Sequence, residues 1–191
     1  MCLTPLNDCE AGMKLFRLPD TVFTAQDYIG SGKGDTMPLN MLKKFLDEHK
    51  VVYETVRHSP AYTSQKTAAS AHVPGKELAK TVVVKVDGKL AMAVLPAPLQ
   101  VDFARLKEGL AGATVELASE QDFRDKFPEC EVGAMPPFGN IYGMQVFADR
   151  HLAEDDEIAF NACTHTELIM LPYKDFERLV KPKVFAFAAG S

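Results

Sequence analysis

The sequence predicts one α+β domain, in which a mixed, largely antiparallel sheet is strongly curved, barrel-like and flanked by helices. The chain has 191 residues, of which 47% are hydrophobic, and this is enough for one domain with a full core. Turn residues join several neighbouring strands as hairpins, which favours antiparallel pairing. The alternation of strands and helices is also too irregular for a doubly wound parallel sheet.

The first 36 residues differ from the rest of the chain. Their apolar residues follow no sustained period, and the segment ends in the flexible composition of residues 29–36. We therefore expect residues 1–36 to be a poorly ordered or variable extension and residues 37–191 to be a single domain. The run Gly30-Ser-Gly-Lys-Gly lacks the spacing of a phosphate-binding loop and follows no strand, so a linker is the better interpretation.

The domain begins with a helix, a strand and a second helix. Apolar residues at helical spacing predict the first helix at residues 39–49, and β-branched and aromatic residues predict a strand at residues 51–57. Pro60 forces an extended exit from that strand. Either Thr63 or Ser64 can cap a short alanine-rich helix that extends through Ala71.

A β-hairpin follows, with Asp87-Gly88 at its turn, the dipeptide favoured in type I′ turns. Lys80 shares one face of the first hairpin strand with Val82, Val84 and Val86, because side chains alternate along a strand. A lysine on this apolar face lies either at the mouth of a pocket or at a strand end, where its ammonium reaches water.

The second half of the domain also alternates between predicted helices and predicted strands. Asp102 can open a helix that closes at Gly112, and Ser119 with Asp122 forms an imperfect capping box for another helix. Pro172 is expected at the first position of the last helix. The strands expected in this half cover residues 114–118, 141–148, 157–161 and 167–171.

Composition limits the possible functions. The net charge of −5 excludes a global basic field for coating DNA or RNA, but it leaves room for a local pocket that grips an RNA end. No apolar run approaches the ~20 residues that span a bilayer, so we expect a cytoplasmic protein with no membrane or DNA partner. No structural zinc spacing is present, so we expect no metal or cofactor, and free thiols at all four cysteines: Cys2, Cys9, Cys130 and Cys163.

Four motifs carry a family resemblance: His58-Ser-Pro-Ala, Ala79-Lys80-Thr81, Gly133-Ala-Met-Pro-Pro-Phe-Gly139 and Asn161-Ala-Cys-Thr-His165-Thr. In this order they resemble the YbaK/prolyl-tRNA-synthetase-associated editing domain family over about residues 38–187. The resemblance implies the fold of that family. It also implies a trans-editing hydrolase that deacylates tRNA mischarged with a small amino acid such as Ala, Ser, Thr or Cys, in particular tRNA for proline. The partners implied are the acceptor end of aminoacyl-tRNA and an aminoacyl-tRNA synthetase.

The resemblance also implies site residues. The central lysine of the family maps onto Lys80, and Gly133 and His165 complete the expected catalytic set. Cys163 stands where relatives usually carry glycine, which leaves the local backbone path open. The residues expected to bind substrate are His58, Thr81, Ala134, Pro136, Pro137, Phe138, Gly139, Cys163 and Thr164.

The residues suggest how such a site would work. Lys80 could supply positive charge, the Gly133 and Ala134 amides could hold the carbonyl or oxyanion, and His165 could orient water or bind the terminal nucleotide. His58 either makes a structural hydrogen bond or lines the rim of the pocket. The rigid Pro-Pro loop is equally compatible with a purely structural role.

Two other functions remain open at this point. A thiol hydrolase would use Cys163 with His165, since residues two apart on an extended segment face the same side. A non-catalytic module would keep the pocket in order to bind a small molecule or a tRNA end.

Overall fold

The structure is a computed structural model that describes residues 38–128 and 130–190. The expectation for residues 1–36 therefore lies outside the described residues. None of the helices in the described ranges is long and apolar enough to cross a membrane.

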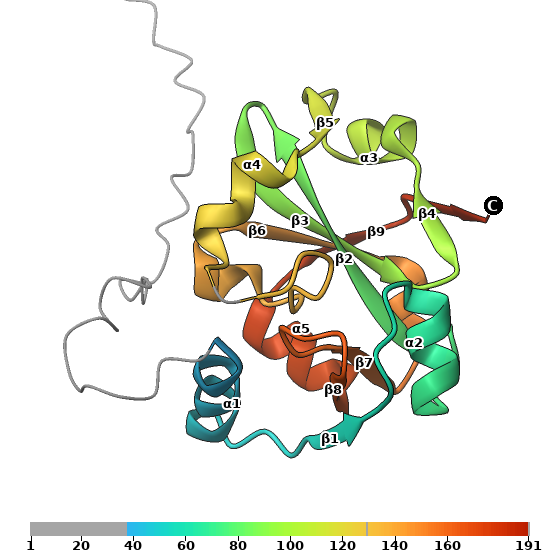
Figure 1. Cartoon of the computed structure of the whole chain (residues 1–191). Coiled ribbons are helices and arrows are strands. Elements are labelled where there is room, and N and C mark those ends of the chain that lie inside the picture. The colour runs from blue at the N-terminus through green and yellow to red at the C-terminus, as the bar shows by residue number, and fades with distance from the viewer. Residues whose placement is uncertain (1–37, 129, 191) are drawn as a thin grey trace, which may run out of the picture.

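An open mixed sheet forms the centre of the domain, with strands in the order β1-β8-β7-β2-β3-β6-β9 and with β5 paired to β2 (Figure 1). A separate two-stranded sheet joins β4 and β10. The strands are β1 (Glu54–Arg57), β2 (Leu78–Val86), β3 (Lys89–Pro96), β4 (Leu99–Val101), β5 (Val115–Leu117), β6 (Gln145–Asp149), β7 (Glu157–Asn161), β8 (Glu167–Pro172), β9 (Lys183–Phe185) and β10 (Ala188–Gly190).

The predicted mixed, largely antiparallel sheet is confirmed. The pairings β2–β7, β3–β6 and β6–β9 are parallel, and the other five are antiparallel. The barrel-like part of the prediction is wrong, because β1 and β9 form opposite edges of the sheet and do not pair with each other. The curvature of this sheet therefore stops short of closure.

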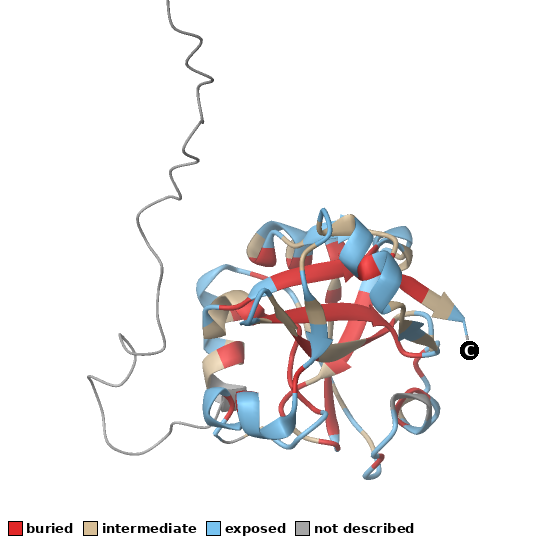
Figure 2. Ribbon diagram, turned by 90° about the horizontal axis from the view of Figure 1, so that it is seen from above, coloured by how far each residue is buried: buried red, intermediate tan, exposed pale blue. Residues whose placement is uncertain are grey.

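Helices cover both faces of the sheet. The α-helices are α1 (Pro38–Glu48), α2 (Ser64–Ala71), α3 (Phe103–Gly109), α4 (Glu120–Phe123) and α5 (Tyr173–Val180). Short 3-10 helices cover η1 (Arg124–Lys126), η2 (Gly139–Tyr142) and η3 (Arg150–Glu154). Buried residues concentrate in the strands, while most of the exposed residues lie in the helices and loops (Figure 2).

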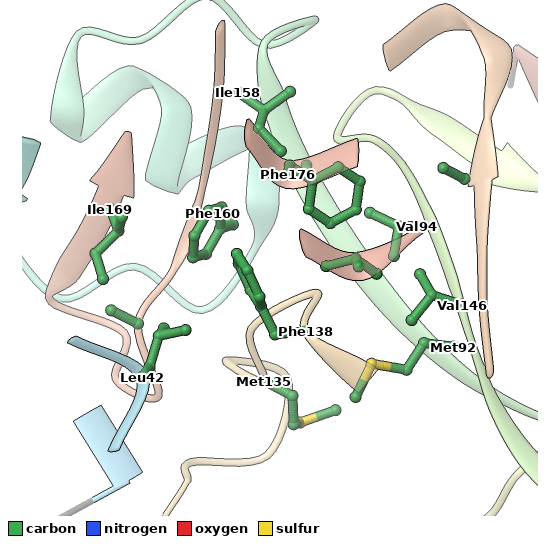
Figure 3. Close-up of a cluster of buried hydrophobic side chains, with 14 of the residues drawn as sticks. Leu42, Met92, Val94, Met135, Phe138, Val146, Ile158, Phe160, Ile169 and Phe176 are labelled. Carbon is green, nitrogen blue, oxygen red and sulfur yellow. The ribbon is translucent and has the colours of Figure 1, made fainter. Parts of the chain in front are cut away.

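The core is divided by the sheet. On one face α1, α5 and the loop before η2 pack on β2 and β3 through residues such as Leu42, Phe138 and Phe176 (Figure 3). On the other face α2 packs through Ala68 on Leu78 and Leu168. A third cluster places α3 and the C-terminal segment against β2, β3 and β6. The two faces of β2 therefore meet different parts of the chain.

The turn and the helix caps that local sequence predicts are present in the structure. Asp87 and Gly88 both have positive φ, 49° and 77°, as a type I′ turn requires. Thr63 caps α2 and Asp102 caps α3 through their side-chain oxygens. The Ser119 N–H donates to the Asp122 carboxylate in the predicted capping box, at 2.8 Å.

Several boundaries differ from the prediction. The first strand begins at Glu54 rather than at residue 51, and β6 begins at Gln145 because the 3-10 helix η2 takes up residues 139–142. Pro172 lies at the N-cap of α5 rather than at its first position. The short strands β4, β9 and β10 were not predicted.

Asp149 secures the C-terminal segment to the sheet. Its buried carboxylate accepts hydrogen bonds from the Phe187 and Ala188 amides, at 2.8 and 2.7 Å, and from the amide and ring of His151. Burial works to raise the pKa of Asp149, but these hydrogen bonds outweigh it, and the pKa is lowered.

Candidate functional site

Three segments meet where β7 ends: residues 58–62, 131–134 and 161–166. The Glu131 amide donates to the Cys163 carbonyl, and the Cys163 amide donates to the Ala134 carbonyl, both at 3.0 Å. On the other side of the 161–166 loop, the His58 amide donates to Thr166 O and the Ala61 amide donates to His165 O. These backbone bonds bring together three of the four sequence motifs.

A disulfide between Cys130 and Cys163 links two of these segments. The prediction of free thiols is therefore wrong for this pair, while Cys2 and Cys9 lie outside the described residues. The Cys163–His165 thiol hydrolase is likewise contradicted, since the sulfur of Cys163 is bonded. Cys163 has a φ of 66°, in the left-handed region that favours glycine. The backbone here therefore has the conformation expected for the glycine that relatives usually carry at this position.

His165 is buried and fixed from three directions. Its ring Nε2–H donates to the Val132 carbonyl at 3.0 Å, and its backbone N–H donates to the Glu131 carboxylate at 2.7 Å. The ring of Tyr62, which is 78% exposed, lies 5.1 Å from the His165 ring between centroids. Because a carbonyl only accepts, the neutral imidazole carries its proton on Nε2 and leaves Nδ1 as an acceptor.

Lys80 is half-buried near the start of β2. Its Nζ donates to the Ala97 carbonyl at 3.1 Å, and burial lowers the pKa of its ammonium. It shares a strand face with Val82 and Val84, as predicted, and this face is opposite to the one that receives Met135 and Phe138. Lys80 and the Pro-Pro loop thus approach the end of β7 from different sides of the sheet.

The amides proposed to hold an oxyanion are partly occupied. The Ala134 N–H donates to Glu131 O at 2.9 Å, so we withdraw it from that role. The Gly133 N–H donates to the Met135 thioether, which is a weak acceptor that a ligand can displace. Gly133 is exposed, and a Cβ at this position would lie 3.5 Å from the His165 ring.

The rest of the Pro-Pro loop is packed in the interior. Phe138 is fully buried against Phe160 and Phe176, with ring centroids at 5.4 and 5.8 Å (Figure 3). A Cβ on Gly139 would lie 2.7 Å from Val146 Cγ2. Pro136 and Pro137 are also buried, so we assign residues 136–139 to supporting the loop rather than to contacting substrate.

The remaining residues that were expected to bind substrate, Thr81, Thr164 and His58, do not all lie on one face of the sheet. Thr81 faces the side of β2 opposite to Lys80, and Thr164 is half-exposed and accepts a hydrogen bond from Thr166 Oγ1 at 3.3 Å. His58 is half-buried, and its Nδ1–H donates to Ser59 O at 2.8 Å. Within the described ranges, no three His, Cys, Asp or Glu side chains are arranged to hold a metal ion.

A cavity of about 550 Å³ borders the 131–134 segment. It shares Glu131 and Val132 with the segments that hold His165, but neither Lys80 nor His165 lines it. Its lining residues are Phe123, Arg124, Asp125, Phe127, Pro128, Cys130, Glu131, Val132 and Met135. The cavity is therefore separate from both Lys80 and His165.

Sequence comparison identifies one family. The sequence model of the aminoacyl-tRNA editing domain matches residues 58–179, a range that includes all the segments of the site. The chain is 34% identical over 114 residues to the multifunctional Ser/Thr-tRNA deacylase ProXp-y of Escherichia coli (strain K12), covering 57% of this chain and 68% of that protein.

Other relatives are longer, and solved structures share the fold. The chain is 26% identical over 107 residues to a proline–tRNA ligase of Bacillus mycoides (strain KBAB4), of which the match covers only 19%. A crystal structure reported as a candidate trans-editing enzyme for prolyl-tRNA synthetase superposes with a TM-score of 0.70 at 15% identity, over 82% of this chain and all of that one.

Proposed function

Since the chain belongs to the aminoacyl-tRNA editing domain family, we propose that it is a hydrolase that deacylates mischarged tRNA in trans. The reaction adds water across the ester that joins the amino acid to the terminal ribose, and it releases the free amino acid and the uncharged tRNA. The match of the family over residues 58–179, which spans Lys80 and His165, carries this proposal.

The substrate is a small amino acid on a non-cognate tRNA, and serine and threonine are the first candidates. The similarity to a protein named as a Ser/Thr-tRNA deacylase supports this choice. The similarity to proline–tRNA ligases supports tRNA for proline as the carrier, and prolyl-tRNA synthetase as the enzyme whose errors are corrected. A pocket of fixed size excludes a larger side chain more effectively than it rejects a smaller one.

Lys80 is the residue that we place at the reacting ester. Its half-buried ammonium offers positive charge where water is partly excluded, so it stabilises the carbonyl oxygen as negative charge develops there. The hydrogen bond to Ala97 O holds the amine at the end of its long side chain. No protein nucleophile is required, because water itself can attack the ester carbonyl, and the ribose hydroxyl of the uncharged tRNA is the leaving group.

His165 is the group that we propose to orient the attacking water or the terminal ribose. Val132 O fixes the proton on Nε2, so Nδ1 is the nitrogen that can accept a proton from a bound hydroxyl. Glu131 acts as a positioning residue, because its carboxylate holds the His165 backbone rather than any reacting atom. The Gly133 amide, next to the ring, is the remaining donor for the carbonyl oxygen.

The test measures release of amino acid from one tRNA for proline charged separately with serine, threonine, alanine, cysteine or proline. We expect rapid release of serine or threonine and slow release of proline. Reactions without protein give the rate of spontaneous ester hydrolysis. If no ester in the panel is released above that rate, the deacylase proposal fails and a binding module that retains the fold becomes the better account.

A further inference from the structure

Two buried polar atoms on the sheet face that carries Lys80 have no hydrogen-bond partner in the described part of the chain: Asn161 Oδ1 and His58 Nε2. Burying an acceptor without a donor costs roughly 1–3 kcal/mol, so such atoms are uncommon and call for an explanation. Neither atom is needed for the hydrogen bonds that join the three segments of the site, since those bonds use backbone groups and the side chains of Glu131 and His165.

Strand register places Asn161 beside Lys80. The parallel strands β2 and β7 pair Leu78 with Ala159 and Ala79 with Phe160, and one further step brings Lys80 level with Asn161. Neighbours at the same level of a sheet share a face. Lys80 and Asn161 therefore both lie on the face that α2 covers, where Leu78 and Ala159 pack against Ala68.

His58 joins them on the same face. Leu168 of β8 pairs with Asn161 on one side and with Val56 on the other, so Val56 and Asn161 face the same way. His58 follows Val56 by two residues, and its amide bond to Thr166 O continues the ladder by one step. Thr81, whose hydroxyl also has no partner in the described ranges, lies on the opposite face and does not belong to this group.

Both unpartnered atoms are acceptors. His58 Nδ1–H donates to Ser59 O, and because a carbonyl only accepts, the neutral ring has a bare lone pair on Nε2. A side-chain amide oxygen likewise only accepts. The missing partner is therefore a hydrogen-bond donor.

The charge of Lys80 indicates which donor fits. An ammonium group would be repelled by the Lys80 ammonium at the same level of the sheet, whereas a hydroxyl carries no net charge. Building on the proposed function, we propose that Asn161, with His58, forms a polar subsite that accepts a hydrogen bond from the side-chain hydroxyl of a seryl or threonyl ester. Asn161 is thus a specificity residue for hydroxylated amino acids.

The first test compares the kcat/KM values for seryl and alanyl esters of the same tRNA, which differ by one hydroxyl. A site built to bond a hydroxyl rejects the analogue that lacks it, so we expect the wild type to favour serine by about tenfold or more. Asn161→Leu should reduce this preference by about tenfold, mainly by slowing seryl release.

The matched control is Asn140→Leu, which alters another amide with an unpartnered buried oxygen, near Leu179. This control should keep the preference. Equal loss on both esters in Asn161→Leu would overturn the subsite.

The second test needs no turnover and no variant. The affinities of the wild type for stable seryl, alanyl and 2-aminobutyryl amides of 3′-amino-3′-deoxyadenosine are measured by calorimetry. Tighter binding of the seryl amide supports the subsite even if no ester is hydrolysed, in which case the proposed function alone has failed. Equal affinity for all three amides overturns the subsite even if the esters are hydrolysed.

Discussion

At the scale of single residues, Lys80 is where burial and charge conflict most directly. Its ammonium is half-buried, and its pKa is lowered because burial disfavours the charged form. The unfolded chain, whose lysine titrates near 10.5, therefore binds more protons than the folded chain in the range between the two pKa values. In this range the free energy of unfolding rises with pH, because the cost of the buried charge disappears as Lys80 loses its proton.

Replacing this lysine by methionine removes the titrating group and keeps an unbranched side chain. We expect the wild type to gain stability relative to Lys80→Met as pH rises from the lowered pKa of Lys80 toward 10.5. Below that lowered pKa, the difference in stability between the two proteins should no longer change with pH. The midpoints of urea unfolding at several pH values measure this difference. A difference that stays constant with pH would show that Lys80 has the same pKa in the folded and unfolded chains.

The sequence pointed to some residues of the proposed site, and the structure shows why others carry no signal in the sequence. Lys80 was noticed because an ammonium interrupts an apolar strand face. Glu131, Tyr62 and Asn161 carry no comparable local signal, since their importance depends on His165 and Lys80 being near them in space. Phe138 and Gly139 belong to a conspicuous motif, but they serve packing.

At the scale of elements, the disulfide between Cys130 and Cys163 fastens the segment before the Pro-Pro loop to the loop that follows β7. The loop after β7 contains His165, and the segment before the Pro-Pro loop binds it through the Glu131 carboxylate and the Val132 carbonyl. A bond that closes a loop of 33 residues restricts the unfolded chain, and the chain-entropy model assigns it about 3–4 kcal/mol of stability.

We therefore expect that replacing both cysteines by serine lowers the free energy of unfolding by about 3–4 kcal/mol. Equilibrium urea unfolding of the wild type under oxidising conditions and of the Cys130→Ser, Cys163→Ser variant measures the loss. A dithiol reductant should shift the wild type toward the variant and leave the variant unchanged. If the reductant leaves the wild-type midpoint in place, the disulfide does not contribute to the stability of the protein.

Local signals predicted the elements that depend on a few neighbouring residues. Two helix caps, at Thr63 and Asp102, and the turn at Asp87-Gly88 formed as expected. Each of them depends only on residues a few positions apart in the sequence. The strands β4, β9 and β10 were missed for the opposite reason. The pairings of β9 with β6 and of β10 with β4 join segments that are far apart in the sequence, and each strand is too short to show a pattern.

At the scale of the whole molecule, the order of the strands creates the site. Parallel pairing of β2 with β7 sets Lys80 level with Asn161, although the two residues are 81 positions apart in the sequence. The antiparallel pairs β7–β8 and β8–β1, which follow on the β7 side, then add His58 and the loop that carries His165. Composition and periodicity predicted the class of the sheet but not its order or its open edges, because strand order is not encoded in any single segment.

The central claim is that the ammonium of Lys80 promotes hydrolysis of the aminoacyl ester. Single-turnover release of serine from mischarged tRNA for proline tests it most directly, with wild type, Lys80→Ala and Lys89→Ala compared at the same pH. Lys89 is exposed at the start of β3, so its replacement removes the same charge away from the site. We expect Lys80→Ala to slow release by about 100-fold or more and Lys89→Ala to match the wild type. Wild-type rates in Lys80→Ala, or equal losses in both variants, would contradict the account.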